Sequence, residues 1–450
     1  MKRYAAYKPT GLKWFPEIPQ EWNWRFLCQV AQEQTIKKPP EEMYPVMTLS
    51  YGEIKRKKNI DSGLVPSNYD NYQMLYKGNI VLRLIDLQND HTSLRTGLVH
   101  ETGIITSAYT CIVSSENPAY IRYLLHSYDT RKVFYGYGGG VRQSIGFKEI
   151  RHLQVSVPPR DEQDQIVRYL DWQVSKINRL IVTKRKQIEL LKEHKEAFIN
   201  TAVTRGIVGD IPLKESGLQW LPKIPAHWKP VPAKALFRNI SELRHEDDPM
   251  LAATQKYGLI EQAEYMRREN RRILLANDNL DKWLHVEPND FIISLRSFQG
   301  GLEKCDKPGC VTWHYVVLRP QQHVYPPFYK WFFKSASYIG ALQKTSDFIR
   351  DGQDLRFSNF VKVGLFVIPM AEQVKIADWL DSEIPKYQKA IDTLEKEIQQ
   401  IIEYRTRLIS DVVTGQIDVR GIEVPDYEHY DEAPENATEE SSDSDYDTEE

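Results

Sequence analysis

The sequence predicts two mixed α/β (α+β) domains in a tandem, pseudo-twofold repeat, separated by long helices that form an antiparallel coiled coil. Three observations lead to this prediction. Two motifs return after about 200 residues, and two long stretches keep the apolar spacing of helices. The regions between them contain short strand-like runs divided by glycine-bearing turns.

Two motifs establish the repeat. The first, called here the Trp motif, spans residues 10–22 and 216–228, and both copies read Gly-Leu-x-Trp, then Pro, Ile-Pro and a final Trp. The second, the Glu-Gln motif, spans 157–166 and 367–376. The intervals are 206 and 210 residues, which is the size of a domain rather than of a solenoid repeat. The chain therefore holds two copies of one unit.

Each copy ends in a long predicted helix, over 161–204 and over 371–414. Apolar residues recur at intervals of three and four through several heptads, which predicts a coiled-coil seam. The seam residues are Ile166, Leu170, Ile177, Ile181, Ile188, Leu191 and Phe198 in the first helix, and Ile376, Leu380, Ile391, Leu394, Ile398, Ile401 and Leu408 in the second.

Three features qualify these helices. Lys184 and Lys195 interrupt the first seam, and Lys195 and Arg405 place a cation at the same point of the two seams. A glycine, Gly206 or Gly415, follows each helix. Pro385 predicts a break that divides the second helix into 371–383 and 386–413. A helix of 30–40 residues is about 45–60 Å long, so a packed pair would form a rigid spacer. The alternative is that each helix covers only its own core.

The globular parts share landmarks but little sequence. Strand-like runs occur at 79–84 and 290–295, and Tyr-Gly pairs stand at 51–52 and 257–258. Between such landmarks the copies differ. We expect one fold with two loop sets, each recognising a different target.

Composition indicates an ordinary globular protein of 450 residues, with 41% hydrophobic and 27% charged residues. The first residues lack the apolar region of a signal peptide, and no apolar run of about 18 residues could span a membrane. Four cysteines are too few for a disulfide framework in a chain of this length. We expect a cytoplasmic protein.

The charge is distributed unevenly. The net charge is −3, but residues 431–450 contain ten acidic and no basic residues, so the rest of the chain carries +7. This composition predicts a disordered tail. A sharper hypothesis is that the tail imitates phosphate and competes for a basic cleft.

Catalytic motifs are missing from the sequence. No Walker loop occurs. The nearest string to the target-amine loop of DNA amino-methyltransferases is Tyr-Pro-Pro-Phe at 325–328, which lacks the polar first residue and is predicted to be a turn. Cys305, Cys310, His314 and His323 lack the paired Cys-x-x-Cys of most structural zinc sites. We therefore expect no catalytic residue and no metal.

Basic and amide side chains are the candidates for DNA contact. A cationic cluster follows the Tyr-Gly pair in both copies and could neutralise phosphates, while arginine and glutamine can make bidentate contacts to base edges. For any one residue the alternative is a surface charge. The candidates are Lys55, Arg56, Lys57, Lys58, Arg142, Gln143, Arg267, Arg268, Arg271, Arg272, Arg296, Gln353 and Arg356.

Together, the repeated Trp and Glu-Gln motifs resemble those of the specificity subunit of type I restriction-modification systems, over residues 8–420. The resemblance implies two target-recognition domains that each read half of a bipartite double-stranded DNA target, with a helical spacer that sets the gap. It also implies two methyltransferase subunits, which use S-adenosylmethionine, and restriction subunits, which use ATP and magnesium. No cofactor is expected on this chain.

On this pattern the chain divides into seven segments. They are an N-terminal segment 1–22, a first recognition domain 23–156, a helical spacer 157–206, a linker 207–228, a second recognition domain 229–366, a second spacer 367–420 and the acidic tail 421–450. The tail departs from the family pattern.

Two other functions stay open at this point. The first is a specificity subunit of a type IIB-like system, in which a fused methyltransferase-nuclease is the partner. The second is a self-sufficient DNA methyltransferase or nuclease, which the missing catalytic loops count against.

Overall fold

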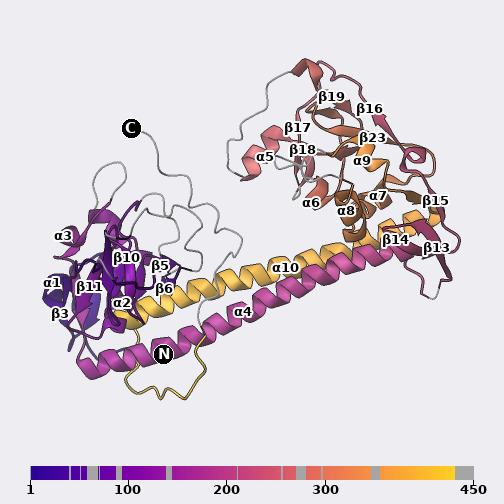
Figure 1. The fold of residues 1–450 in the computed structure, drawn as a ribbon. Helices are drawn as coiled ribbons and strands as arrows, with labels where there is room; N and C mark the ends of the chain where they lie inside the picture. The colour runs from indigo at the N-terminus through magenta and orange to yellow at the C-terminus, as the bar shows by residue number, and fades with distance from the viewer. Residues whose placement is uncertain are drawn as a thin grey trace. The chain divides into compact units, whose positions relative to one another are not determined.

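The computed structural model describes residues 2–39, 42–50, 52–57, 69, 71–87, 94–137, 144–209, 211–254, 257–269, 280–294, 297–345 and 355–430. The chain divides into two compact units (Figure 1). Unit 1 consists of Met1–Arg185 and Glu395–Glu450, and unit 2 of Lys186–Leu394. The division crosses both long helices, so the seven segments expected from sequence stay a prediction.

Unit 1 is built from antiparallel sheets and short helices. Its four-stranded sheet has the order β4-β11-β8-β9, from Ala31–Glu33, Thr110–Ser114, Ile80–Leu82 and Thr96–Leu98. Its two-stranded sheets are β1 (Tyr7–Pro9) with β2 (Glu17–Pro19), β3 (Asn23–Phe26) with β12 (Gln154–Val157), β5 (Met47–Ser50) with β6 (Glu53–Arg56), and β7 (Tyr72–Leu75) with β10 (Gly103–Thr106). Its short helices are α1 (Leu27–Val30), α2 (Pro118–Thr130), η1 (Val133–Tyr137) and α3 (Phe147–Ile150).

Unit 2 repeats this plan. Its four-stranded sheet has the order β16-β23-β20-β21, from Phe237–Ile240, Val316–Pro320, Phe291–Ile293 and Glu303–Lys304. Its two-stranded sheets are β13 (Leu213–Leu218) with β14 (Leu221–Pro225), β15 (Lys229–Val231) with β24 (Leu365–Val367), β17 (Leu251–Thr254) with β18 (Gly258–Glu261), and β19 (Leu284–Val286) with β22 (Gly309–Val311). The helices are η2 (Ala233–Ala235), α5 (Gln262–Glu269), η3 (Leu280–Lys282), α6 (Ser297–Gly300), α7 (Pro326–Phe332), α8 (Ala336–Gln343) and α9 (Phe357–Phe360).

Among the described residues, every sheet of one unit has a counterpart in the other. The prediction of two mixed α/β domains in tandem is confirmed. The predicted strand-like runs at 79–84 and 290–295 contain β8 and β20. Of the Tyr-Gly landmarks, Gly52 lies in the turn of the β5-β6 hairpin and Gly258 begins β18 in the equivalent β17-β18 hairpin, with φ of 80° and 68°. Tyr51 lies outside the described residues. Such positive values favour glycine because it has no Cβ.

The long helices are α4 (Arg160–Arg205) and α10 (Met370–Val413). In unit 1, Lys184 Nζ lies 2.6 Å from Glu397 Oε2, and Arg405 donates to Asn178 Oδ1 at 2.8 Å. In unit 2, the rings of Phe198 and Trp379 lie 4.5 Å apart. In both units α10 runs opposite to α4, so the predicted antiparallel coiled coil is confirmed (Figure 1).

The seam residues are buried to different degrees. Among them, Leu191, Phe198, Leu394 and Ile401 are half-buried, whereas the other ten are buried. The two seam cations differ. Arg405 is buried against Asn178, whereas Lys195 is half-buried and bonds Gln388 at 3.3 Å. Gly206 and Gly415, at φ of 80° and 72°, follow the helix ends.

The predicted break at Pro385 is wrong, because α10 continues through it. Proline removes one helical hydrogen bond and costs about 3 kcal/mol in a helix interior. Ile384 and Ile391, on either side, are 8% and 1% exposed, so packing against the core offsets that cost. The predicted turn at 325–328 is also wrong. Tyr325 is the N-cap of α7, and the two prolines occupy its first turn, where the missing N–H groups would have no helical partner.

No helix in the described part of the chain is long and apolar enough to cross a membrane.

Candidate DNA-recognition site

The two repeated motifs meet in each unit. The indole of Trp22 donates to Glu162 Oε1 at 3.1 Å, and the indole of Trp228 donates to Glu372 Oε2 at 3.1 Å. Both tryptophans are fully buried. The tryptophan that closes each Trp motif therefore holds the glutamate of the Glu-Gln motif, at the start of the long helix.

The glutamine of each Glu-Gln motif fixes the adjoining backbone. Gln163 accepts from the Asn117 N–H at 3.0 Å and donates to the Pro158 carbonyl at 2.9 Å. Gln373 does the same with Tyr325 and Ile368, at 2.8 Å each. These bonds join the long helix to the first turn of α2 or α7. The motif thus positions the globular part of its own copy.

Each unit also contains the helix end of the other copy. In unit 1, Tyr120 Oη donates to the Val413 carbonyl at 3.2 Å, and Ser127 bonds Ser410 at 2.9 Å. In unit 2, the Ser337 N–H donates to Asn200 at 3.0 Å. Asn200 and Ser410 occupy corresponding positions, 210 residues apart. In both units the globular part therefore contacts the corresponding end of the other copy's long helix.

Two candidate DNA contacts of unit 1 lie on the β5-β6 hairpin. Lys55 and Arg56 are exposed on β6. Lys55 pairs with Glu53 at 2.6 Å, and Arg56 makes two hydrogen bonds to Glu101. These bonds lower the pKa of Glu101. Lys57, after the strand, is half-buried. A DNA phosphate would compete with these carboxylates for the cations.

The candidates of unit 2 lie on a helix that follows the equivalent hairpin. Arg267 and Arg268 are exposed on α5. Arg268 pairs with Glu264, and its guanidinium lies 5.0 Å from the ring centre of Tyr257. The described cations of the two clusters therefore lie on different elements, Lys55 and Arg56 on a strand and Arg267 and Arg268 on a helix.

Among the remaining candidates for DNA contact, the structure describes one. Arg356 is exposed at the N-cap of α9. The others lie outside the described residues: Lys58, Arg142, Gln143, Arg271, Arg272, Arg296 and Gln353. So does the acidic tail 431–450.

The cysteines and histidines weighed as a zinc set do not gather. Cys305 Sγ contacts the Lys307 carbonyl at 2.9 Å, and burial raises the pKa of Cys305 and of Cys310 to about 11. The ring of His314 stacks on Trp313 at 3.6 Å. A different group, Glu242, His245 and His285, brings three potential ligand atoms within 4.8 Å of one another among the described residues.

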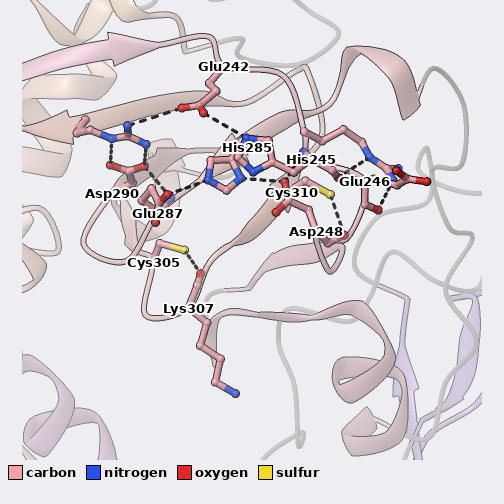
Figure 2. Close-up of polar contacts among 12 residues, drawn as sticks. Glu242, His245, Glu246, Asp248, His285, Glu287, Asp290, Cys305, Lys307 and Cys310 are labelled. Atoms are coloured by element: carbon pink, nitrogen blue, oxygen red, sulfur yellow. Dashed lines mark hydrogen bonds and ion pairs between the residues drawn. The ribbon is translucent and has the colours of Figure 1, made fainter.

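That group is a polar cluster missed by the sequence reasoning (Figure 2). His285, on β19, is 3% exposed. Burial disfavours its charged form, but hydrogen bonds to the carboxylates of Glu287 and Asp248 outweigh this, and the pKa of His285 is raised. The cluster has no spacing motif, since His245 and His285 are 40 residues apart. The only signal was a histidine inside an otherwise apolar strand.

The geometry defines a class: a protein made of two copies of one mixed α/β unit, joined through two long helices that both units share, with charged side chains at equivalent hairpins. No family model matches the chain. The putative type I restriction enzyme MjaX specificity subunit of Methanocaldococcus jannaschii is 24% identical over 319 residues, which cover 67% of this chain and 69% of that protein.

One solved structure shares the fold. A chain from work described as the structural basis underlying complex assembly and conformational transition of the type I R-M system aligns with a TM-score of 0.61 and 14% identity, covering 89% of this chain and 99% of that one. The HsdS subunit from Thermoanaerobacter tengcongensis aligns with a TM-score of 0.44 and 15% identity, over 88% and 96%. The resemblance of this chain to type I specificity subunits is confirmed.

Proposed function

We propose that this chain is the DNA sequence-specificity subunit of a type I restriction-modification complex, and that each unit reads one half of a bipartite, gapped target. The observation that carries the proposal is the duplicated backbone frame with different side chains at equivalent places. A protein that read one target twice would need the same side chains in both frames. Two different sets suit two different half-sites.

The equivalent hairpins support DNA contact by both units. Two exposed cations, Lys55 and Arg56, lie on the hairpin of unit 1, and two more, Arg267 and Arg268, lie on the helix that follows the hairpin of unit 2. Cations near phosphates release counterions from DNA and so supply affinity independent of sequence. Specificity would come from other side chains of the same units, through contacts to base edges.

The long helices support a role as spacer and docking surface. With 46 and 44 residues, they are about 66–69 Å long at 1.5 Å per residue. Each belongs in part to both units. We propose that they set the gap between the half-sites and bind the methyltransferase subunits.

Catalysis is assigned to the partners in this proposal. Two methyltransferase subunits would supply S-adenosylmethionine and the adenine chemistry, and restriction subunits would supply ATP-driven activity with magnesium. This chain would then be a non-catalytic scaffold.

Single-molecule sequencing of methylated DNA tests the proposal, using the source cell with the gene intact, deleted, and restored in trans. We expect one gapped adenine-methylation motif to disappear on deletion and to return with the restored gene. A deletion that leaves every methylated motif in place, in cells that express the neighbouring subunits, would overturn the proposal.

A further inference from the structure

The cluster around His285 lies on a fixed backbone. The segment before β17 runs along β19, where the His285 N–H donates to the Glu242 carbonyl at 2.8 Å and the Arg244 N–H donates to the Trp283 carbonyl at 2.9 Å. On the other side of β19, Cys310 of β22 pairs with His285. The residues on these strands are therefore held in place before any ligand binds.

Unit 1 has the same backbone with different contents. There the Met74 N–H donates to the Ile36 carbonyl at 2.8 Å, and Met74 pairs with Ile104 of β10. Thus Met74 corresponds to His285, Ile104 to Cys310, and Ile36 to Glu242. Met74 and Ile104 are buried in an apolar cluster. The fold does not need a polar group at this place, so the cluster of unit 2 calls for a different explanation.

Two pairs of atoms lie at distances that fit a small cation, and the potential ligand atoms of Glu242, His245 and His285 lie within 4.8 Å of one another. His245 Nε2 lies 3.3 Å from Glu242 Oε1, and His285 Nε2 lies 3.0 Å from Glu287 Oε1. The rings of His245 and His285 lie 4.0 Å apart between these carboxylates (Figure 2). Ligands at about 2.0–2.1 Å from a tetrahedral zinc ion are about 3.3 Å apart. We propose that Glu242, His245 and His285 bind one divalent transition-metal ion of the zinc type, with Glu287 beside the fourth position.

The buried histidine is oriented as metal ligands are. His285 Nδ1 bonds Asp248 Oδ2 at 2.8 Å, and the same carboxylate oxygen accepts from the backbone N–H of His245 at 2.8 Å. A carboxylate on one ring nitrogen fixes the tautomer and directs the other nitrogen to the metal. Asp248 is therefore a positioning residue, and it ties the turn of His245 to β19.

The charge of the cluster also suits a divalent ion. The carboxylates of Glu242, Asp248, Glu287 and Asp290 outnumber the two guanidiniums nearby. Arg319 makes two bonds to Asp290, at 2.9 and 2.8 Å, and lies 3.8 Å from Glu242. Arg244 donates to backbone carbonyls instead. Two imidazoles select zinc or its neighbours in the transition series over magnesium or calcium, which prefer oxygen ligands alone.

The occupied site would fix the segment that leads from β16 into the β17-β18 hairpin. That segment contains Glu242, His245 and Asp248, and α5 with its arginines follows the hairpin. The metal would thus have a structural role in unit 2 alone.

Zinc binding to the full chain tests the inference. The chain, free of any histidine tag, is stripped with a chelator, dialysed and titrated with Zn²⁺ by calorimetry, and bound metal is counted by elemental analysis. We expect one zinc per chain in the wild type. His245→Ala and Glu242→Gln should each weaken binding by about tenfold or more. Both side chains are largely exposed, so these variants keep the fold, which circular dichroism verifies.

His314→Ala is the matched control. It removes an exposed histidine of the same unit that lies outside the cluster, and it should leave zinc affinity unchanged. Binding of less than one zinc per chain, or equal affinity in the wild type and His245→Ala, would overturn the inference. So would a site that takes Mg²⁺ as tightly as Zn²⁺. The measurement uses no DNA and no partner subunit, so it stands apart from the proposed function.

Discussion

Unit 1 and unit 2 place opposite chemistry on one backbone. The strand pair β7-β10 holds Met74 and Ile104 in an apolar cluster, whereas the equivalent pair β19-β22 holds Cys310 and His285, which bonds the carboxylates of Asp248 and Glu287. The corresponding backbone hydrogen bonds from Met74 to Ile36 and from His285 to Glu242 are both 2.8 Å long. The frame therefore depends on backbone pairing and on the repeated motifs, and the residues inside it are free to differ.

The largest effect should come from the feature that both units share. Trp22→Ala and Trp228→Ala each remove a fully buried indole and leave Glu162 or Glu372 without that donor. Each should lower the free energy of unfolding by about 3–5 kcal/mol. Urea denaturation measures this, with Trp313→Ala, at an exposed tryptophan, as the control. A large loss of stability from one of the two substitutions and none from the other would show that the two motifs do not have the same structural role.

Acid should weaken unit 1 through His126. Burial, then Arg122 and Arg405, lower its pKa to about 3, whereas the unfolded value is about 6.5. Below pH 6.5 the unfolded chain takes up a proton that the folded chain does not. Stability is therefore present above that pH and lost below it, by about 2–3 kcal/mol at pH 4.5.

Hydrogen exchange of unit 1 against pH measures this loss. His126→Gln does not titrate, so it should flatten the dependence between pH 6.5 and 4.5. If the variant and the wild type lose protection in parallel, His126 is not the cause.

Two corresponding glycines should respond alike. A Cβ at Gly103 would lie 2.8 Å from the Pro45 carbonyl oxygen, and one at Gly309 would lie 2.7 Å from the Pro249 carbonyl oxygen. Gly103→Ala and Gly309→Ala should each cost about 1–3 kcal/mol. Thermal denaturation checks this against Gly340→Ala, which meets nothing within 4 Å and lies in α8, where alanine stabilises. Opposite signs at 103 and 309 would show that the frames are not equivalent.

The smallest effect should come from the exposed cations. Lys55→Ala and Arg267→Ala should weaken non-specific DNA binding and reduce the slope of log affinity against log salt by about one each. Fluorescence anisotropy over a salt series measures the slope. Lys330→Ala, an exposed cation paired with Asp381 on α10, is the matched control. If the salt slope changes equally in all three variants, neither Lys55 nor Arg267 contacts a DNA phosphate.

The sequence predicted the features that repeat. The Trp and Glu-Gln motifs are visible because they recur, and the long helices follow from the apolar periodicity of their sequences. The antiparallel packing follows from a twofold relation between the two copies. The predicted helix break at Pro385 was wrong because the rule for proline is local and does not include the packing of the residues on both sides of it. The predicted turn at 325–328 was wrong because prolines also begin helices.

The sequence could not predict contacts between distant residues. Nothing local indicates that Val413 belongs to the core near Tyr120, because the two are 293 residues apart. His245 and His285 meet only when β19 aligns with the segment before β17. The candidate cations were named by their position after a landmark, but the carboxylate that holds Arg56 is Glu101, 45 residues away between β9 and β10.

Exchange of one recognition domain tests the central claim most directly. Residues 229–366 are replaced by the equivalent segment of another type I specificity subunit, and methylated motifs are mapped in cells that supply the partner subunits. We predict that one half of the bipartite motif changes, while the other half and the gap are retained. The reciprocal exchange of residues 23–156 should change the other half. If either exchange alters both halves or neither, the two units do not read separate half-sites.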